Sequence, residues 1–231
     1  MTKAALIVAH GQPSDPAPAE AEIAALAAKV QALMPDWRVA SATLATAGAL
    51  ADRVADLGPE GMVYPLFMAG GWFTRTHLPA RLAEAGGAAW HILPPFGEDA
   101  AVQALTVTLA REAAGDRDPA TVEVILAAHG SFRSPAPSEI AFRMADRIRA
   151  ETGFKRVEAG FIDQSPQIAE VAAYFVPGGV VLPFFAARGG HVIDDLPQAL
   201  EDAGFVGTLL PPVGLDPRVP GLIAAALRAG L

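Results

Sequence analysis

Two histidines of this chain occupy positions from which they could share one metal ion. His129 follows a predicted strand at 122–127, and His191 follows an apolar run at 180–185 and a pair of glycines. Apolar runs without polar alternation are typical of parallel strands that are covered on both faces. Neighbouring strands lie about 5 Å apart, so adjacent placement of these two brings both histidines to one sheet edge, where open α/β sheets bind ligands.

Paired imidazoles suit a metal ion that must be released again. Neutral imidazole binds cobalt, nickel, iron and zinc, and with an ordinary pKa of about 6.5 it also accepts protons at neutral pH. Water or a carboxylate beside two histidines leaves coordination positions open for a ligand. Asp163 follows a further predicted strand and could orient a ligand or move a proton. An aspartate that caps a turn fits the same position equally well.

The chain contains an internal repeat, which places a related histidine pattern in its first half. Three segments recur in the same order, with 9–11 returning as 128–130, 63–86 as 181–204, and 93–105 as 210–222. The first of these is Ala-His-Gly in both halves, so His10 corresponds to His129. A repeated sequence indicates a repeated fold.

Each half alternates strands with helices, which is the pattern of a doubly wound parallel sheet. Strands are predicted at 4–9, 38–43, 62–67, 90–93, 122–127, 156–161, 180–185 and 206–210, and helices at 19–34, 46–57, 78–85, 99–114, 138–151, 166–174, 196–203 and 217–229. The charged segment 115–119 separates a first lobe, 1–116, from a second lobe, 120–231. We expect an α/β protein with two duplicated four-stranded parallel sheets, related by a pseudo-twofold axis, and a cleft between them. If the third strand of a half lies beside its first, as in a sheet of order 2-1-3-4, the gap between these two strands is the ligand-binding crevice.

The two halves differ at the predicted metal site. The repeat places Phe73 where His191 stands, and His77 where Asp195 stands. A metal site in the first lobe therefore requires His10 together with the displaced His77. The second lobe, which keeps both histidines in register, is the preferred metal site.

These residues resemble the sirohydrochlorin chelatases of cobalamin and sirohaem synthesis, relatives of the class II tetrapyrrole chelatases. The resemblance covers nearly the whole chain and rests on a strand followed by His129-Gly-Ser and on Leu-Pro-Phe-Phe followed by Gly-Gly-His191-Val. It implies a two-lobed α/β protein with a tetrapyrrole between the lobes and a divalent metal held by His129 and His191. Asp163 stands where relatives often have a glutamate, and relatives that use the first lobe would place the metal at His10 and His77.

The resemblance implies insertion of a divalent metal ion, itself a substrate, into a polycarboxylated tetrapyrrole without an organic cofactor. Co²⁺, for cobalamin biosynthesis, is the favoured ion; Fe²⁺, for sirohaem, is the alternative, and Ni²⁺ also suits imidazole. Arg133, Arg188 and Arg75 lie in loops of the predicted cleft, where guanidinium groups match carboxylates, although solvated loop charges fit equally well. Ser131 and Trp72 complete the predicted substrate site, with the indole offering an apolar surface to the macrocycle.

Composition excludes several other classes of protein. The 231 residues are 52% hydrophobic, enough for a substantial core, carry a net charge of −8 and include no cysteine. This acidic balance disfavours nucleic acid or anionic membrane as a partner, and the lack of cysteine excludes disulfides and thiolate metal sites. No apolar run approaches the roughly 18 residues of a spanning helix, so we expect a cytoplasmic protein.

Particular residues disfavour three other functions: metal storage or delivery, phosphatase activity and nucleotide binding. A metal-storage or metal-delivery protein would use the same histidines without a macrocycle, and would leave the loop arginines unexplained. A histidine phosphatase needs an arginine directly before its histidine, where this chain has Ala9 and Ala128. Glycine patterns of nucleotide-binding loops do not open either half.

Overall fold

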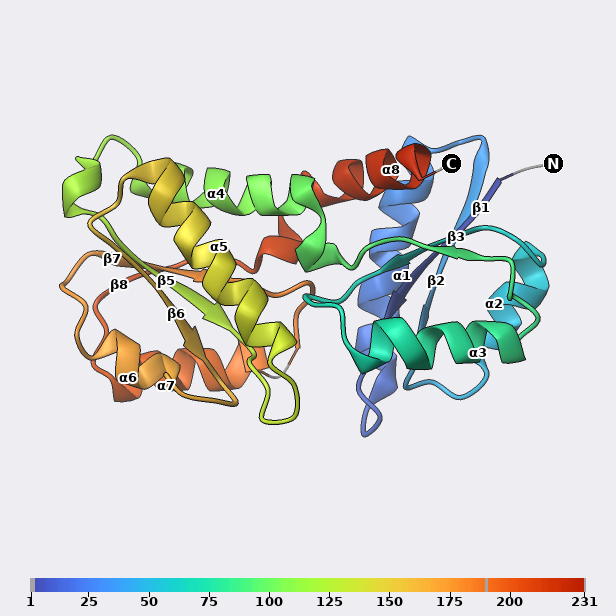
Figure 1. Cartoon of the computed structure of the whole chain (residues 1–231), viewed down its shortest axis with the longest axis horizontal. Coiled ribbons are helices and arrows are strands. Elements are labelled where there is room, and N and C mark those ends of the chain that lie inside the picture. The colour runs from blue at the N-terminus through green and yellow to red at the C-terminus, as the bar shows by residue number, and fades with distance from the viewer. Residues whose placement is uncertain (1–2, 190, 231) are drawn as a thin grey trace. The chain divides into compact units, whose positions relative to one another are not determined.

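Two four-stranded parallel sheets form the framework of the protein (Figure 1). The computed structural model describes residues 3–189 and 191–230, with the backbone alone described for His191. The first sheet has the order β2-β1-β3-β4 and the second β6-β5-β7-β8. The strands are β1 (Lys3–Ala9), β2 (Trp37–Thr43), β3 (Met62–Pro65), β4 (His91–Ile92), β5 (Glu123–Ala128), β6 (Arg156–Phe161), β7 (Gly179–Pro183) and β8 (Gly207–Leu209). The predicted α/β fold is confirmed, and both sheets have the strand order 2-1-3-4 on which the pairing of His129 with His191 depends.

The two inner strands of each sheet are buried, because helices cover both faces. Residues 4–8 of β1 and every residue of β3, β5 and β7 are buried. All three residues of the edge strand β8 are exposed. This contrast explains why the inner strands are mostly apolar in the sequence. The observed strands β3, β4, β7 and β8 are each shorter than predicted.

Helices pack in pairs on each sheet. They are α1 (Pro16–Leu33), α2 (Ala49–Leu57), α3 (Leu78–Glu84), α4 (Ala100–Ala114), α5 (Ala136–Thr152), α6 (Ile168–Ala172), α7 (Leu196–Asp202) and α8 (Val219–Ala229). In one unit α1 packs with α8 and α2 with α3; in the other, α4 packs with α5 and α6 with α7. None of the helices in the described ranges is long and apolar enough to span a membrane.

The two compact units exchange their last helices. One unit ends at Asp99 and resumes at Pro217, and the other comprises Ala100–Asp216. Helix α4 therefore belongs to the first repeat by sequence but packs with α5, and α8 belongs to the second repeat but packs with α1. The lobes 1–116 and 120–231 describe the duplicated sequence, whereas the packing units divide after Asp99 and after Asp216. The placement of the two units, and with it the pseudo-twofold axis and the cleft, stays a prediction.

A π-helical turn leads into the third helix of each repeat. These turns are η1 (Phe73–His77), before α3, and η4 (His191–Asp195), before α7. The N–H of Leu78 donates to the carbonyl oxygen of Phe73, five residues earlier. Pro79 and Pro197 have no N–H to continue the ordinary ladder, which explains the wide turn before each of them. His191 was predicted to lie in a loop. Its backbone instead begins the turn η4.

Candidate functional site

Backbone geometry holds His129 in one orientation directly after β5. Its ring nitrogen Nδ1 lies 2.9 Å from the carbonyl oxygen of Gly130. A carbonyl oxygen only accepts hydrogen bonds, so Nδ1 carries the proton in this contact and Nε2 has the lone pair that binds a metal or takes a proton. Gly130 has φ +73°, and a Cβ atom on it would lie 2.6 Å from Cγ of Gln164. Only glycine fits directly after this histidine.

Asp163 lies beside His129. Its Oδ2 is 3.5 Å from Nδ1 of the histidine, and its backbone N–H donates to the carbonyl oxygen of His129 at 2.9 Å. The two side chains are 40% and 42% exposed, so both can reach a ligand in solvent. Because the Nδ1 proton is directed to Gly130, the carboxylate acts on the ring through its negative charge, which favours a cation bound to the imidazole. This geometry supports an electrostatic orienting role for Asp163.

The strands that precede His129 and His191 are neighbours. Leu126 pairs with Leu182 and Ala127 with Pro183, so β5 and β7 run side by side. His191 begins the turn η4, but its side chain lies outside the described residues, and its pairing with His129 stays a prediction. Among the described side chains, which do not include that of His191, no group of three or more His, Asp or Glu residues is arranged to hold a metal ion.

Four aromatic rings gather near the end of β1 in the first unit. The ring of Phe73 lies 4.4 Å from that of His10 and 5.8 Å from that of His77, and Trp72 stacks on His77 at 4.7 Å. Partial desolvation lowers the pKa of His10, and positive charge on His77 lowers it further. Neutral imidazole is the form that binds metal, so the secondary pair of histidines also has suitable chemistry.

Two of the predicted substrate-binding residues lie in the loop that carries His129. The backbone N–H of Arg133 donates to Oγ of Ser131 at 3.1 Å, and the N–H of Ser131 donates to Oε1 of Gln164 at 2.8 Å. The Arg133 side chain is exposed, as is that of Arg188 in the loop after β7. Because β5 and β7 are neighbours, both arginines lie at the same edge of the second sheet as His129.

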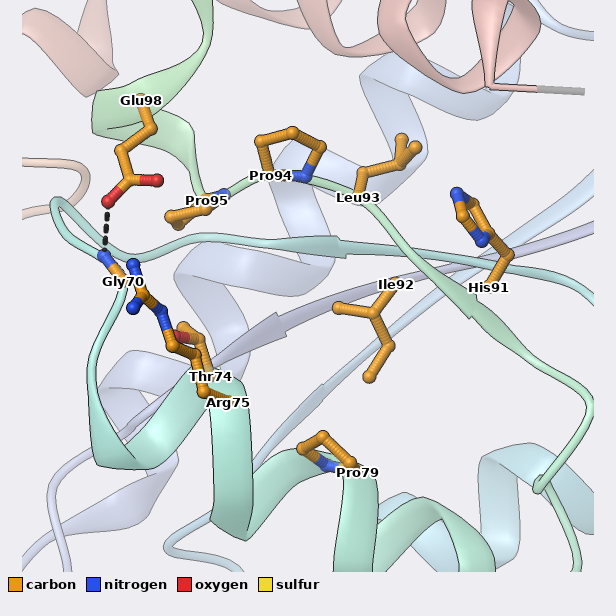
Figure 2. A pocket seen from close by; sticks show the side chains of 10 residues that line it. All are labelled: Gly70, Thr74, Arg75, Pro79, His91, Ile92, Leu93, Pro94, Pro95 and Glu98. Atoms are coloured by element: carbon orange, nitrogen blue, oxygen red, sulfur yellow. Dashed lines mark hydrogen bonds between the residues drawn. The ribbon is translucent and has the colours of Figure 1, made fainter.

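Arg75 and His77 lie on different sides of η1. Side chains two residues apart on a helical turn do not face each other, and Figure 2 shows Arg75 directed toward Gly70 and Glu98. Arg75 lines a pocket beside β4 that includes neither His10 nor His77. Trp72, which is 60% exposed and stacks on His77, does not line this pocket.

Two exposed apolar side chains near the second histidine pair were missed by sequence reasoning. Phe132 is 82% exposed and follows Ser131 directly, and Ile193, 56% exposed, lies in η4. Large apolar side chains beside polar site residues suit an extended apolar ligand. The position of Phe132 directly after His-Gly-Ser could have indicated a site residue from the sequence alone. The exposure of Ile193 could not, because it depends on the π-helical turn, which was not predicted.

Comparison with protein families identifies the chain. The CbiX family matches residues 4–113 and again residues 123–229. The chain belongs to the CbiX family. The two matches follow the two sequence repeats, and the resemblance based on the His-Gly and Gly-Gly-His motifs is confirmed.

Relatives of this CbiX chain carry names from tetrapyrrole chemistry. A solved CbiX structure, named as the terminal enzyme for biosynthesis of siroheme in denitrifying bacteria, is 48% identical, with a TM-score of 0.89 over 99% of this chain and 100% of that one. A probable sirohydrochlorin cobaltochelatase of Halobacterium salinarum is 26% identical over 168 residues, which are 60% of this chain and 56% of that protein. The chain thus matches about half the length of this curated relative.

A more distant structure shares the two-sheet fold. SirB from Bacillus subtilis with Fe³⁺ is 16% identical, with a TM-score of 0.77 over 99% of this chain and 95% of that one. At this identity the likeness concerns the fold alone.

Proposed function

We propose that this CbiX chain is a sirohydrochlorin chelatase that inserts a divalent metal ion into the tetrapyrrole, with Co²⁺ the favoured ion. The observation that carries the proposal is His129, which lies at the carboxyl edge of a parallel sheet with Nδ1 oriented by Gly130 and Asp163. Insertion exchanges two pyrrole protons for one metal ion. It needs groups that bind the ion loosely and accept protons, and neutral imidazole does both.

His129 and His191 bind the metal in this proposal, and Asp163 orients the first of them. The repeat supports the pairing, because Phe73 stands at the place of His191 and its ring lies 4.4 Å from that of His10. In the first unit, where both rings are described, the side chain at the position equivalent to His191 therefore reaches the histidine that follows β1. The alternative pair is His10 with His77, and it is supported by the burial of His10, which lowers the pKa of that imidazole and keeps it in the neutral form that binds metal.

The remaining predicted residues bind the macrocycle in this proposal. Arg133, Arg188 and Arg75 pair with its carboxylates, Ser131 offers a hydroxyl group, and Trp72 covers an apolar face. The acidic chain needs such local positive charge because its net charge of −8 repels a polycarboxylate.

Iron is the second candidate metal. The relative named for siroheme biosynthesis is 48% identical to this chain, whereas the relative named for cobalt is 26% identical over part of it. Co²⁺ binds nitrogen ligands more strongly than Fe²⁺ in the general affinity order, so we expect cobalt to work at least as well in purified solution. A cytoplasmic location and the absence of an organic cofactor belong to the same proposal.

A spectroscopic assay tests the proposed activity. Purified protein is mixed with metal-free sirohydrochlorin and Co²⁺, Ni²⁺ or, without oxygen, Fe²⁺, and the absorption of the macrocycle is followed. A chelatase accelerates the spectral change over many turnovers and releases two protons for each metal inserted. A metal-storage or metal-delivery protein binds the ion and leaves the spontaneous rate unchanged, and that outcome with all three ions would refute the proposal.

A further inference from the structure

A pocket of about 410 Å³ lies beside the edge strand β4, and its lining includes neither His10 nor His77. Its walls come from the loop before η1, from η1 and α3, and from the segment that runs from β4 to the short helix η2 (Phe96–Glu98). Most of the wall is apolar, and Figure 2 shows Arg75 and Glu98 near Gly70 and His91 at the opposite end of the pocket. The volume falls within the range of about 300–1,000 Å³ that is usual for small-molecule sites.

Glu98 and Gly70 shape one end of this pocket. Oε1 of Glu98 accepts a hydrogen bond of 2.7 Å from the N–H of Gly70, which ties the loop before η1 to η2 (Figure 2). A Cβ atom on Gly70 would lie 2.9 Å from that oxygen and 3.0 Å from Nη2 of Arg75. The missing side chain of Gly70 thus leaves open the space between Arg75 and Glu98.

The guanidinium group of Arg75 has no protein partner among the described residues. No hydrogen bond or ion pair joins it to a side chain or carbonyl oxygen within residues 3–189 and 191–230. Its forked donors match a carboxylate, and the adjacent walls of Pro79, Pro94 and Pro95 are rigid and apolar. A ligand that fits both features has a carboxylate on a small apolar body.

We propose that this pocket binds such a carboxylate group, with Arg75 as its ionic partner and Glu98 as the residue that shapes the loop. Two sources supply this chemistry. One is a carboxylate arm of the macrocycle, in which case the inference rests on the proposed function. The other is a separate small carboxylic acid, which binds whether or not the protein is a chelatase.

The first test uses 3-phenylpropionate as the probe and follows backbone amide shifts around Gly70 and Ile92 by NMR. Arg75→Met should weaken binding at least about tenfold, because a charge-assisted hydrogen-bonded pair is lost. Glu98→Gln should tighten it severalfold, because one negative charge leaves the pocket while an amide oxygen still accepts from Gly70. The control is Arg81→Met, which removes an exposed arginine that pairs with Glu84 at 3.6 Å.

Metal-free sirohydrochlorin distinguishes the two sources. If it displaces the probe, and if Arg75→Met raises KM for the tetrapyrrole more than it lowers kcat, the pocket takes an arm of the macrocycle. If the probe stays bound and KM is unchanged, the pocket takes a separate acid. The proposal is overturned if wild-type protein binds no probe and Arg75→Met leaves KM unchanged, or if Arg81→Met has the same effects. If wild-type protein has no chelatase activity, the proposed function is refuted, but the binding of 3-phenylpropionate still tests the pocket.

Discussion

His10 and His129 occupy equivalent positions in the repeat but have different neighbours. His129 has a carboxylate oxygen 3.5 Å from its Nδ1, whereas His10 is next to the ring of Phe73 and is affected by charge on His77. A nearby negative charge favours a bound cation, and a nearby positive charge opposes one. At the scale of single residues, this difference favours the second unit for the metal.

Histidine variants test which pair binds the metal. His129→Ala or His191→Ala should lower the rate of metal insertion at least about 100-fold, because each removes a ligand and a proton acceptor. His10→Ala and His77→Ala serve as matched variants from the other repeat and should cause a smaller loss. The rates come from the absorption assay, with circular dichroism as the control for folding. An equal loss from the first-unit variants would move the metal site to that unit.

Asp163→Asn tests the orienting carboxylate. It should weaken metal binding about 10- to 100-fold, because the amide has no negative charge to favour a cation bound to the imidazole of His129. Competition with a coloured chelator measures the affinity. Asp146→Asn, which removes an exposed acid on α5 that pairs with Arg149, should leave it unchanged. An unchanged metal affinity of Asp163→Asn would indicate that Asp163 only caps the turn and does not act on His129.

Trp72→Ala tests the apolar surface expected for the macrocycle. The indole is 60% exposed and stacks on His77, so its loss should raise KM for sirohydrochlorin with little effect on stability. Tyr174→Ala is the control, because this side chain is 77% exposed and lies after α6. Equal KM values in Trp72→Ala and wild-type protein would contradict the assignment.

At the scale of elements, the buried carboxylate of Glu123 links the beginning of β5 to the segments that precede β6 and β7 in the second sheet. Glu123 begins β5, and its carboxylate pairs with Nζ of Lys155 at 2.7 Å and accepts from the N–H of Val176 at 3.2 Å. Burial raises the pKa of the Glu123 carboxyl, but these hydrogen bonds and the charges of Lys155 and Arg156 outweigh it, so the pKa lies below its ordinary value. The first repeat has Ala4 at this place.

This ion pair predicts a pH dependence of stability. Because the folded pKa of Glu123 is lowered, its contribution is complete above the unfolded pKa of about 4.3 and is lost as the pH falls through the folded value. Lys155→Met should lower the free energy of unfolding at pH 7 by about 1–2 kcal/mol, since half of the lysine is exposed. Urea unfolding from pH 3 to pH 7 should show this difference shrinking toward acid. Lys29→Met, on the exposed side of α1, is the control, and a difference independent of pH would contradict the assignment.

At the scale of the whole molecule, the exchange of α4 and α8 makes each unit depend on both halves of the sequence. Arg228 of α8 donates to the carbonyl oxygen of Leu33 at 2.6 Å, and Arg147 of α5 donates to Gln103 of α4 at 3.3 Å. A sequence half produced alone therefore lacks one helix of its own unit and carries one that packs elsewhere.

Fragments test this dependence. Residues 1–99 joined to 217–231 by a flexible linker of about 20 residues should unfold cooperatively on heating, because α1 keeps its partner α8. The fragment 1–116 should show weaker cooperativity, because α1 is uncovered and the buried face of α4, including Val102 and Leu105, is exposed. Circular dichroism measures both transitions. A cooperative transition of 1–116 at the same temperature would show that the exchange is dispensable.

The sequence by itself determined the duplication, the alternation of strands and helices, and the position of His129 after a predicted strand. These follow from local patterns, because buried parallel strands are continuously apolar and a repeat keeps its register. Only the tertiary structure decided that α4 and α8 change places, that Asp163 lies beside His129, and that Arg75 lines a separate pocket. The physical reason is that an apolar helix face fits either sheet, and side chains far apart in the sequence meet only through packing.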